Sequence, residues 1–381
     1  MTTIRDVARA AGVSIATVSR VFNGSSRVTE ATNLRVRSAA SRLDYWPNGA
    51  ARSLNTSRTQ ALGVLLPDLY GEFYSEVIRG IDHAARHEHY QVLVSSSHAD
   101  TEALIAVARS MRGRVDGLIV MAPDEVTAVA IDKLTGSFPI VLLNPPFDVS
   151  SCITISIANF EGAHAMVQHL LHMGHRSIAM IKGPQGNIDS EERYRGYCAA
   201  LRQGGLEPES SLLLQGDFTE SSGYRSAQKI LRRKPRPTAV FAANDYMAVG
   251  LMSALGAAGV RVPQDVAVTG FDDIAIAQYL TPPLTTVRVD AYGLGERAVR
   301  RWISLGSNGD ASKAAHEVIP ATLVVRNSCG TSKALSIDLR PRRGGRGSVP
   351  TDDVHSDSAA RKIRGASSIA SGLKMGGGER E

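Results

Sequence analysis

Three histidines lie close together in the sequence, at positions 83, 87 and 89, and imidazole is a common metal ligand. His83 and His87 are four residues apart, so a helix would place them on one face. The segment between them lacks the glutamate of the zinc-protease pattern H-E-x-x-H, and this helix face is expected to be exposed to solvent. We therefore interpret the three histidines as surface residues and predict no metal site.

Other patterns that would carry catalysis do not occur in the sequence. Cys152, Cys198 and Cys329 are far apart and form no C-x-x-C pair, so we expect reduced thiols that are buried or idle. The chain has no G-x-G-x-x-G after a strand, no G-x-x-x-x-G-K-[ST] loop and no G-x-S-x-G elbow, and KGPQGN lacks the spacing of a phosphate loop. We therefore predict that the protein is not an enzyme and has no cofactor.

Positive charge is concentrated in two parts of the chain. Residues 1–60 hold nine arginines, no lysine and three acidic residues, whereas residues 61–330 hold 24 basic and 28 acidic residues. Residues 331–381 hold ten basic and six acidic residues. A small basic segment ahead of a mildly acidic body indicates a polyanion as the partner of that segment.

Length and hydropathy limit the protein class further. A chain of 381 residues with 43% hydrophobic residues predicts two or three folded domains. No apolar run reaches the roughly 18 residues that a membrane-spanning helix needs, and the N-terminus lacks the apolar region of a signal peptide. We expect a cytoplasmic protein with no membrane partner.

The N-terminal segment predicts three short helices. Residues 3–6 have the spacing of a capping box, and apolar residues then recur at helical intervals. Gly12 can end this helix, Ser14 can cap a second helix over about Ile15 to Phe22, and Thr29 can cap a third. Two short helices joined by a glycine turn describe a helix-turn-helix, whose second helix enters the DNA major groove. An ordinary three-helix bundle has the same periodicity, and the local positive charge favours DNA.

The stretch TIRDVARAAGVSIATVSRVFNG closely resembles the N-terminus of the lactose-repressor/galactose-repressor (LacI/GalR) family of bacterial transcriptional regulators. The resemblance extends to about residue 330. It implies that the second helix is the recognition helix and that Ile15, Ala16 and Arg20 reach base edges. Arg20 can donate two hydrogen bonds to guanine, whereas Ile15 and Ala16 offer only apolar contact. The implied phosphate contacts are Thr3, Ser14, Thr17, Ser19 and Asn23, with plain helix capping as an equal alternative for Ser14.

LDYWPNGAARSL resembles the hinge of the same family, and we interpret residues 48–60 as a hinge helix and linker. The resemblance implies that a short helix capped by Asn48, with Arg52 on it, folds on the operator. Ala51 would let the helices of two protomers approach in the minor groove. Leu54 would be the wedge that kinks the central base step.

From residue 61 onward, apolar strand-like runs alternate with segments of helix length, a pattern typical of parallel α/β sheets with helices on both faces. The resemblance implies two subdomains like those of periplasmic binding proteins within residues 61–330. We expect three crossovers between them, near residues 157–160, 287–290 and 318–320. Residues 331–381 are rich in glycine, serine and arginine, and we expect them to be disordered.

Ligands of open α/β sheets bind beyond the carboxyl ends of the strands, so the cleft between the two subdomains is the expected effector site. The resemblance implies contacts from Tyr70, Phe73, Tyr74, Asn187, Asp189, Arg193, Phe218, Asn244, Asp245 and Asp272. Carboxylates, amides and an arginine beside an aromatic wall suit a sugar or polyol, and a nucleobase or nucleoside is the alternative. Asn144-Pro145-Pro146 stands where many sugar-responsive members have an Asp-Arg pair, which weakens the sugar assignment.

We therefore interpret the protein as a sequence-specific DNA-binding regulator controlled by a small molecule. We expect a repressor that binds pseudo-palindromic operator DNA as a homodimer at the nucleoid. A corepressor-dependent member, an activator and a plain solute-binding protein are the alternatives. Arg193 and Asp272 could also pair with each other as a structural ion pair that makes no ligand contact.

Overall fold

The structure is a computed structural model that describes residues 2–22, 26–46, 58–98, 100–121, 123, 139–146, 152–307, 315–331 and 335–339. Several residues with predicted roles lie outside the described residues, namely Asn23, Asn48, Ala51, Arg52 and Leu54. The chain from residue 340 onward also lies outside them.

The N-terminal segment forms three helices, α1 (Ile4–Ala11), α2 (Ile15–Phe22) and α3 (Glu30–Arg42), as predicted. The capping box is present, because the backbone N–H of Thr3 and its hydroxyl both donate to the Asp6 carboxylate, over 3.0 and 2.7 Å. Gly12 ends α1 with a φ of 65°, in the left-handed region that glycine adopts at low cost. The helices enclose a small core of their own, made of Val7, Ala8, Ala11, Val18, Val21, Val36, Ala39 and Ala40.

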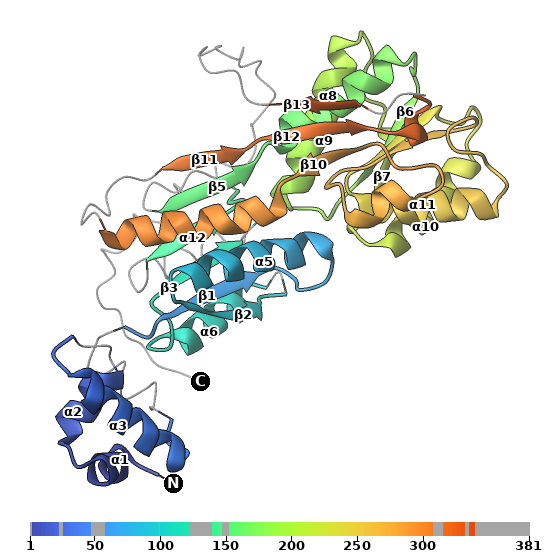
Figure 1. Cartoon of the computed structure of the whole chain (residues 1–381). Helices are drawn as coiled ribbons and strands as arrows, with labels where there is room; N and C mark the ends of the chain where they lie inside the picture. Colours follow the sequence, from blue (N-terminus) through green and yellow to red (C-terminus); the bar gives the residue numbers. More distant parts are fainter. Residues whose placement is uncertain are drawn as a thin grey trace, which may run out of the picture. The chain divides into compact units, whose positions relative to one another are not determined.

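The first subdomain of the body is built on a six-stranded parallel sheet (Figure 1). Its strand order is β11-β5-β4-β3-β1-β2. The strands are β1 (Ala61–Leu66), β2 (Gln91–Ser96), β3 (Gly117–Met121), β4 (Ile140–Leu143), β5 (Ile153–Ile157) and β11 (His316–Ile319). The helices are α5 (Glu72–His87), α6 (Thr101–Met111) and α12 (Ala291–Ser307). Strands β1, β3 and β4 are buried along their whole length, as the apolar runs predicted.

The second subdomain has a four-stranded parallel sheet in the order β7-β6-β8-β9. Its strands are β6 (Ile178–Lys182), β7 (Leu213–Gln215), β8 (Ala239–Ala242) and β9 (Ala267–Thr269). Its α-helices are α8 (Asn159–His172), α9 (Ile188–Gln203), α10 (Glu220–Leu231) and α11 (Asp245–Ala257). Three short 3₁₀ helices complete it, η1 (Ser210–Leu212), η2 (Ala275–Tyr279) and η3 (Asn327–Cys329).

An antiparallel sheet of three strands adjoins the second subdomain, in the order β10-β12-β13. Its strands are β10 (Thr286–Val289), β12 (Ala321–Val325) and β13 (Leu335–Asp338), and the sequence reasoning missed it. One β-bridge joins Thr269, the last residue of β9, to Thr285 just before β10, and another joins Asp272 in the loop after β9 to Arg288 in β10. Strand β13 lies within the segment that we expected to be disordered from residue 331. Its backbone pairs with the neighbouring strand β12, which a composition argument does not detect.

The chain passes between the two subdomains three times. It leaves the first sheet after β5 and enters α8, returns after β10 through α12, and leaves again between β11 and β12. Helix α12 thus packs along α5, although more than 200 residues of sequence separate them. Two glycines, Gly80 in α5 and Gly295 in α12, allow this contact, because a Cβ on either would collide with the backbone of the other helix.

The residues first considered for metal chemistry lie where they were expected. His83, His87 and His89 are exposed, and the described residues contain no cluster of three potential ligands that could hold a metal ion. The three cysteines are free thiols and are all buried. No helix among the described parts of the chain is both long enough and apolar enough to cross a bilayer.

The close contact of α5 with α12 predicts the effect of one added methyl group. Gly80→Ala should lower the free energy of unfolding by about 1–3 kcal/mol, because the new Cβ must push the backbone at Tyr292 aside. Gly256→Ala is the matched control, since Gly256 lies in α11 with open space around it, and should stabilise the protein by about 0.5–1 kcal/mol. Urea unfolding of both variants measures the difference, and equal stabilities would contradict the packing described.

Candidate functional site

A cavity of about 360 Å³ lies between the two subdomains, at the carboxyl ends of strands from both parallel sheets. Nine of the ten predicted contact residues line it, namely Tyr70, Phe73, Tyr74, Asn187, Asp189, Arg193, Phe218, Asn244 and Asp272. The resemblance therefore led to residues that the fold brings together from five separate segments of the chain.

Arg193 lies at the centre of the polar wall and is 4% exposed. Its Nε donates to Asn159 Oδ1 over 2.9 Å, Nη1 donates to the Ala243 carbonyl over 2.5 Å, and Nη2 donates to Asp272 Oδ1 over 3.2 Å. The guanidinium also stacks on the Phe271 ring, with its carbon 3.8 Å from the ring centroid. These contacts orient the guanidinium and use three of its five N–H groups.

Asp272 follows β9 and is held in an unusual backbone conformation, with a φ of 107°. A non-glycine residue rarely adopts this region, and strain of this kind is common where a side chain must point into a site. Burial raises the pKa of Asp272 to about 6, although the Arg193 guanidinium acts in the opposite direction. Arg193 and Asp272 form an ion pair, with 3.2 Å between Nη2 and Oδ1, and both residues also line the cavity.

Asp189, in the first turn of α9, is the second acidic group of the cavity. Its Oδ1 accepts a hydrogen bond from Asn159 Nδ2 over 2.7 Å, and its Oδ2 accepts one from Asn144 Nδ2 over 3.3 Å. Burial raises the pKa of Asp189, while Arg193 and the two amides lower it. Asn187 caps α9, because its side-chain oxygen accepts from the Ser190 N–H over 3.0 Å.

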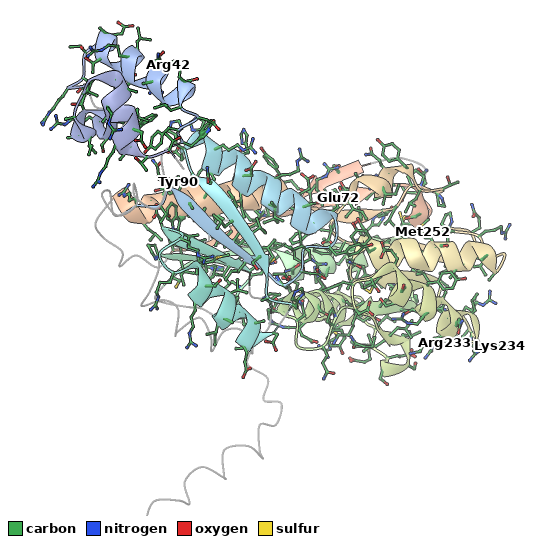
Figure 2. The ribbon with its side chains drawn as sticks, turned by 90° about the horizontal axis from the view of Figure 1, so that it is seen from below. Arg42, Glu72, Tyr90, Arg233, Lys234 and Met252 are labelled. Atoms are coloured by element: carbon green, nitrogen blue, oxygen red, sulfur yellow. The ribbon has the colours of Figure 1, made fainter. Side chains whose placement is uncertain are left out.

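Aromatic residues form the other walls. Tyr70, Phe73 and Tyr74 come from the first subdomain, at and before the start of α5, and Phe218 faces them from the second. Figure 2 shows Glu72 at the end of α5 that approaches the second subdomain. There the backbone N–H of Glu72 donates to the Tyr246 hydroxyl over 2.8 Å, and its carboxylate accepts from the backbone of the second subdomain. These contacts join the two subdomains beside the cavity.

The prediction for Asp245 is wrong, because its side chain does not reach the cavity. Asp245 is fully buried behind the cavity wall, where it accepts from the Thr286 hydroxyl over 2.6 Å and from the Ile274 N–H over 3.0 Å. Burial raises its pKa well above the usual range. Asn244 does line the cavity, but its amide is engaged as the cap of α11 and as a donor to the Phe218 carbonyl.

Sequence reasoning missed several lining residues, namely Pro67, Asp68, Gly71, His98, Pro184, Asp217, Thr219 and Tyr246. Asp68, His98 and Asp217 follow the carboxyl ends of β1, β2 and β7, so the rule that located Asp272 would have indicated them. Asp217 accepts hydrogen bonds from Thr219 and pairs with Arg225 over 3.2 Å. Its pKa is lowered by the contacts with Thr219, Ser222 and Arg225, which outweigh its burial.

Helix α2 presents three of its predicted DNA-contacting residues to solvent. Ile15 is 45% exposed, and Ala16 and Arg20 are exposed as well. Ser14 caps the helix, because its hydroxyl accepts from the Thr17 N–H over 3.1 Å and lies 2.9 Å from the Thr17 hydroxyl. Of the other predicted phosphate contacts, Thr3 belongs to the capping box and Ser19 is half-buried.

Comparison with known proteins gives two family matches. Residues 3–48 match the model of bacterial regulatory proteins of the lacI family, and residues 167–329 match a periplasmic binding protein-like domain. The ribose operon repressor of Escherichia coli is 36% identical over 302 residues, which are 78% of this chain and 91% of that protein. The chain belongs to the LacI family of bacterial regulatory proteins.

Solved structures agree with this assignment. The lac repressor dimer bound to operator and the anti-inducer ONPF is 32% identical, with a TM-score of 0.77 over 86% of this chain and 99% of that one. A complex of the transcriptional regulator CelR with cellobiose is 32% identical, with a TM-score of 0.65 over 86% of this chain and all of that one. As a member of the LacI family, the protein is a DNA-binding transcriptional repressor under effector control, and it is not an enzyme.

The pKa of Asp272 predicts how stability depends on pH. A carboxyl group whose pKa is higher in the folded state than in the unfolded chain destabilises the fold when it ionises. The contribution of Asp272 should therefore fall as pH rises from about 4 to about 6, by an amount on the order of 2–3 kcal/mol. Asp272→Asn cannot ionise, so its stability relative to the parent should rise across this window.

Thermal or urea unfolding of both proteins between pH 4 and 7.5 measures this slope. The comparison uses the change with pH and not the offset, because the substitution also alters the contact with Arg193. A stability difference that is constant across the window would show that Asp272 does not titrate there.

Proposed function

We propose that the protein binds a pseudo-palindromic operator as a homodimer, with α2 of each protomer in the major groove of one half-site. Arg20 reads a guanine, and Ile15 and Ala16 make apolar contact with neighbouring bases. Two observations support this role. The three side chains are exposed on α2, and helices α1 to α3 enclose a core of their own. The lac repressor structure, to which this chain is similar, contains such a dimer on its operator. The repressor acts in the cytoplasm, at the nucleoid.

We further propose that the effector is a neutral polyhydroxylated molecule, a sugar or sugar derivative. The observation that carries this proposal is the Arg193–Asp272 ion pair in the cavity wall. A carboxylate accepts hydrogen bonds from vicinal hydroxyls, and the remaining N–H groups of the guanidinium can donate to hydroxyl or ring oxygens. Aromatic side chains on both sides of the cavity can cover the apolar faces of a sugar ring.

The charge of the cavity argues against an anionic effector. Four carboxylates line it, from Asp68, Asp189, Asp217 and Asp272, whereas Arg193 is the one arginine or lysine among the lining residues of the described chain. Arg225 offsets Asp217 from outside. The remaining negative charge repels a phosphorylated or carboxylated ligand, because like charges in a cavity of low dielectric interact strongly. The proposal therefore predicts that the protein binds a free sugar more tightly than the phosphate ester of the same sugar.

Cavity size also favours a small ligand. About 360 Å³ is near the lower end of the range of small-molecule pockets, about 300–1,000 Å³. A nucleoside remains the alternative effector, because the facing aromatic residues Tyr70 and Phe218 can also stack on a base. The ribose operon repressor and the cellobiose complex, both similar to this chain, are named for sugars.

Effector and operator binding are linked through the arrangement of the two subdomains. If the two ligands favour different arrangements, each weakens the binding of the other by the same factor. Three chain crossings connect the subdomains, so a change at the cavity reaches both halves of the body. The hinge segment, residues 48–60, would transmit this change to the recognition helices, with Leu54 as the minor-groove wedge.

The first prediction from this proposal concerns base recognition. Arg20→Ala should weaken operator binding by about 1–3 kcal/mol per half-site and relax the preference at one base pair, because a bidentate contact to guanine is lost. Selection from a randomised operator library measures the preference. Arg9→Ala, which removes the same charge from the exposed face of α1, serves as control and should leave base preference unchanged. An Arg20→Ala protein with the parent's preference at every position would rule out the assignment.

The second prediction concerns the effector. Arg193→Ala and Asp272→Asn should each reduce effector affinity about ten- to a hundredfold, because each loses a charged hydrogen bond, while operator affinity without effector is retained. Titration calorimetry with D-ribose, cellobiose, xylitol, ribose 5-phosphate and adenosine identifies the ligand class. Arg195→Ala, an exposed neighbour on the same helix, is the control and should bind like the parent.

The affinity of the parent should also rise with pH. With a pKa of about 6, the Asp272 carboxylate is mostly protonated at pH 5, so affinity for a hydroxyl donor should increase about tenfold between pH 5 and 7.5. Asp272→Asn should abolish this dependence. Tight binding of ribose 5-phosphate, with no binding of neutral sugars, would refute the proposed effector class.

A further inference from the structure

The first turn of α9 belongs to the second subdomain, yet it is bonded to strand ends of the first. The backbone N–H of Ile188 donates over 2.7 Å to the carbonyl of Pro123, which follows β3. Asn144, which follows β4, donates from Nδ2 to the Asp189 carboxylate over 3.3 Å. Asn187 and Asp189 of the same turn line the cavity. The segment of residues 187–189 therefore both lines the proposed effector cavity and bonds to the other subdomain.

Asn144 is held on three sides. It is 2% exposed and has a φ of 47°, in the left-handed region, which asparagine tolerates better than most residues. Its backbone N–H donates to the Ile155 carbonyl over 2.9 Å, and its side-chain oxygen accepts from the Ile157 N–H over 3.0 Å. Because Ile157 can only donate there, the oxygen of the amide must face Ile157 and the NH₂ group must face Asp189.

We propose that Asn144 is a positioning residue for effector binding, which holds the Asp189 carboxylate in the cavity from the first subdomain. Asp189 is thereby joined to Ile157, the last residue of β5, where the chain first crosses between the subdomains. On its other side, Asn159 Nδ2 donates to Asp189 Oδ1, and Asn159 Oδ1 accepts from Arg193. A continuous chain of hydrogen bonds leads from the crossover to the ion pair that lines the cavity.

This role requires a hydrogen-bond donor at position 144, which the Asn144 amide supplies. Asp189 is an acceptor on both oxygens, so its partner must be a donor, and a carboxylate at position 144 would repel it. The charged groups near Asp189 are Arg193 and Glu192 on its own helix and Asp272 from the facing loop. Two carboxylates at positions 144 and 189 could coexist only by sharing a proton, which requires low pH.

Amide hydrogen exchange of the full-length protein without ligand tests the positioning. Asn144→Asp should lower the protection factors of Ile188 to Arg193 about tenfold at pH 7.5 and much less at pH 5, where a shared proton restores the contact. The double variant Asn144→Asp with Asp189→Asn reverses donor and acceptor while it keeps every hydrogen bond, and should restore protection at both pH values. Asn33→Asp adds the same charge in α3, keeps its contact with Arg37, and should change nothing in α9.

Asn144→Ala adds no charge and covers the possibility that the aspartate variant does not fold. It should lower the same protection factors equally at pH 5 and 7.5, because no proton can replace the lost donor. Unchanged protection in a folded Asn144 variant, or failure of the double variant to restore it, would overturn the proposal.

The effector part of the inference rests on the proposed function, and D-ribose serves as its probe. In Asn144→Asp the rise of affinity with pH expected for the parent should be lost or reversed, because repulsion at high pH displaces Asp189. A variant whose pH profile matches the parent's would contradict the role of Asn144 in binding. If the parent itself binds no D-ribose, the effector assignment fails for this sugar, and the exchange experiment still decides whether Asn144 positions Asp189.

Discussion

Arg193 carries a permanent positive charge in a place where water barely reaches it, and an uncompensated charge there would strongly destabilise the fold. Its compensation comes from parts of the chain that are distant in sequence. Asn159 lies at the first crossover, Ala243 directly follows the central strand β8 of the second sheet, and Asp272 lies in the loop after β9. The need to satisfy one guanidinium therefore fixes three segments at the same point, and the cavity forms around it.

The Asp272 and Asp189 carboxylates that face the cavity are held in place from behind. Asp272 points into the cavity from a strained turn. The buried carboxylate of Asp245 holds this turn, because it accepts hydrogen bonds from the backbone N–H of Ile274, two residues after Asp272, and from the hydroxyl of Thr286 in β10. Asp189 is held by two amides, from Asn144 and Asn159. Carboxylates held in this way are preorganised, so binding at them requires little reordering of side chains. This arrangement also means that movement of a support is transmitted to the ligand.

Local sequence pattern was enough to predict the three N-terminal helices and most strands of the two parallel sheets. Capping residues and glycine placed α1 and α2 to the residue, and long apolar runs placed the buried strands. The antiparallel sheet was missed because β10 and β12 look like connecting segments until the neighbouring strands are known, and pairing is a non-local property. At the start of α11, residues 244–246 are Asn, Asp and Tyr, three adjacent residues with polar side chains. Asn244 caps α11 and lines the cavity, Asp245 is buried, and Tyr246 lines the cavity. The direction of each side chain follows from the helix geometry and not from the residue type.

The interleaving of the two subdomains has a consequence for synthesis of the chain. Strand β11 completes one edge of the first sheet and α12 covers that sheet, yet both are translated after the entire parallel sheet of the second subdomain. During synthesis, more than 130 residues are added between the end of β5 and the start of α12. Over this interval, the sheet face that α12 later covers remains exposed on strands β1 to β5. Domains that fold as contiguous segments avoid such a delay, and exposed apolar surface during it promotes aggregation. The interleaved topology therefore keeps the first subdomain incomplete until the second subdomain's parallel sheet has been synthesised.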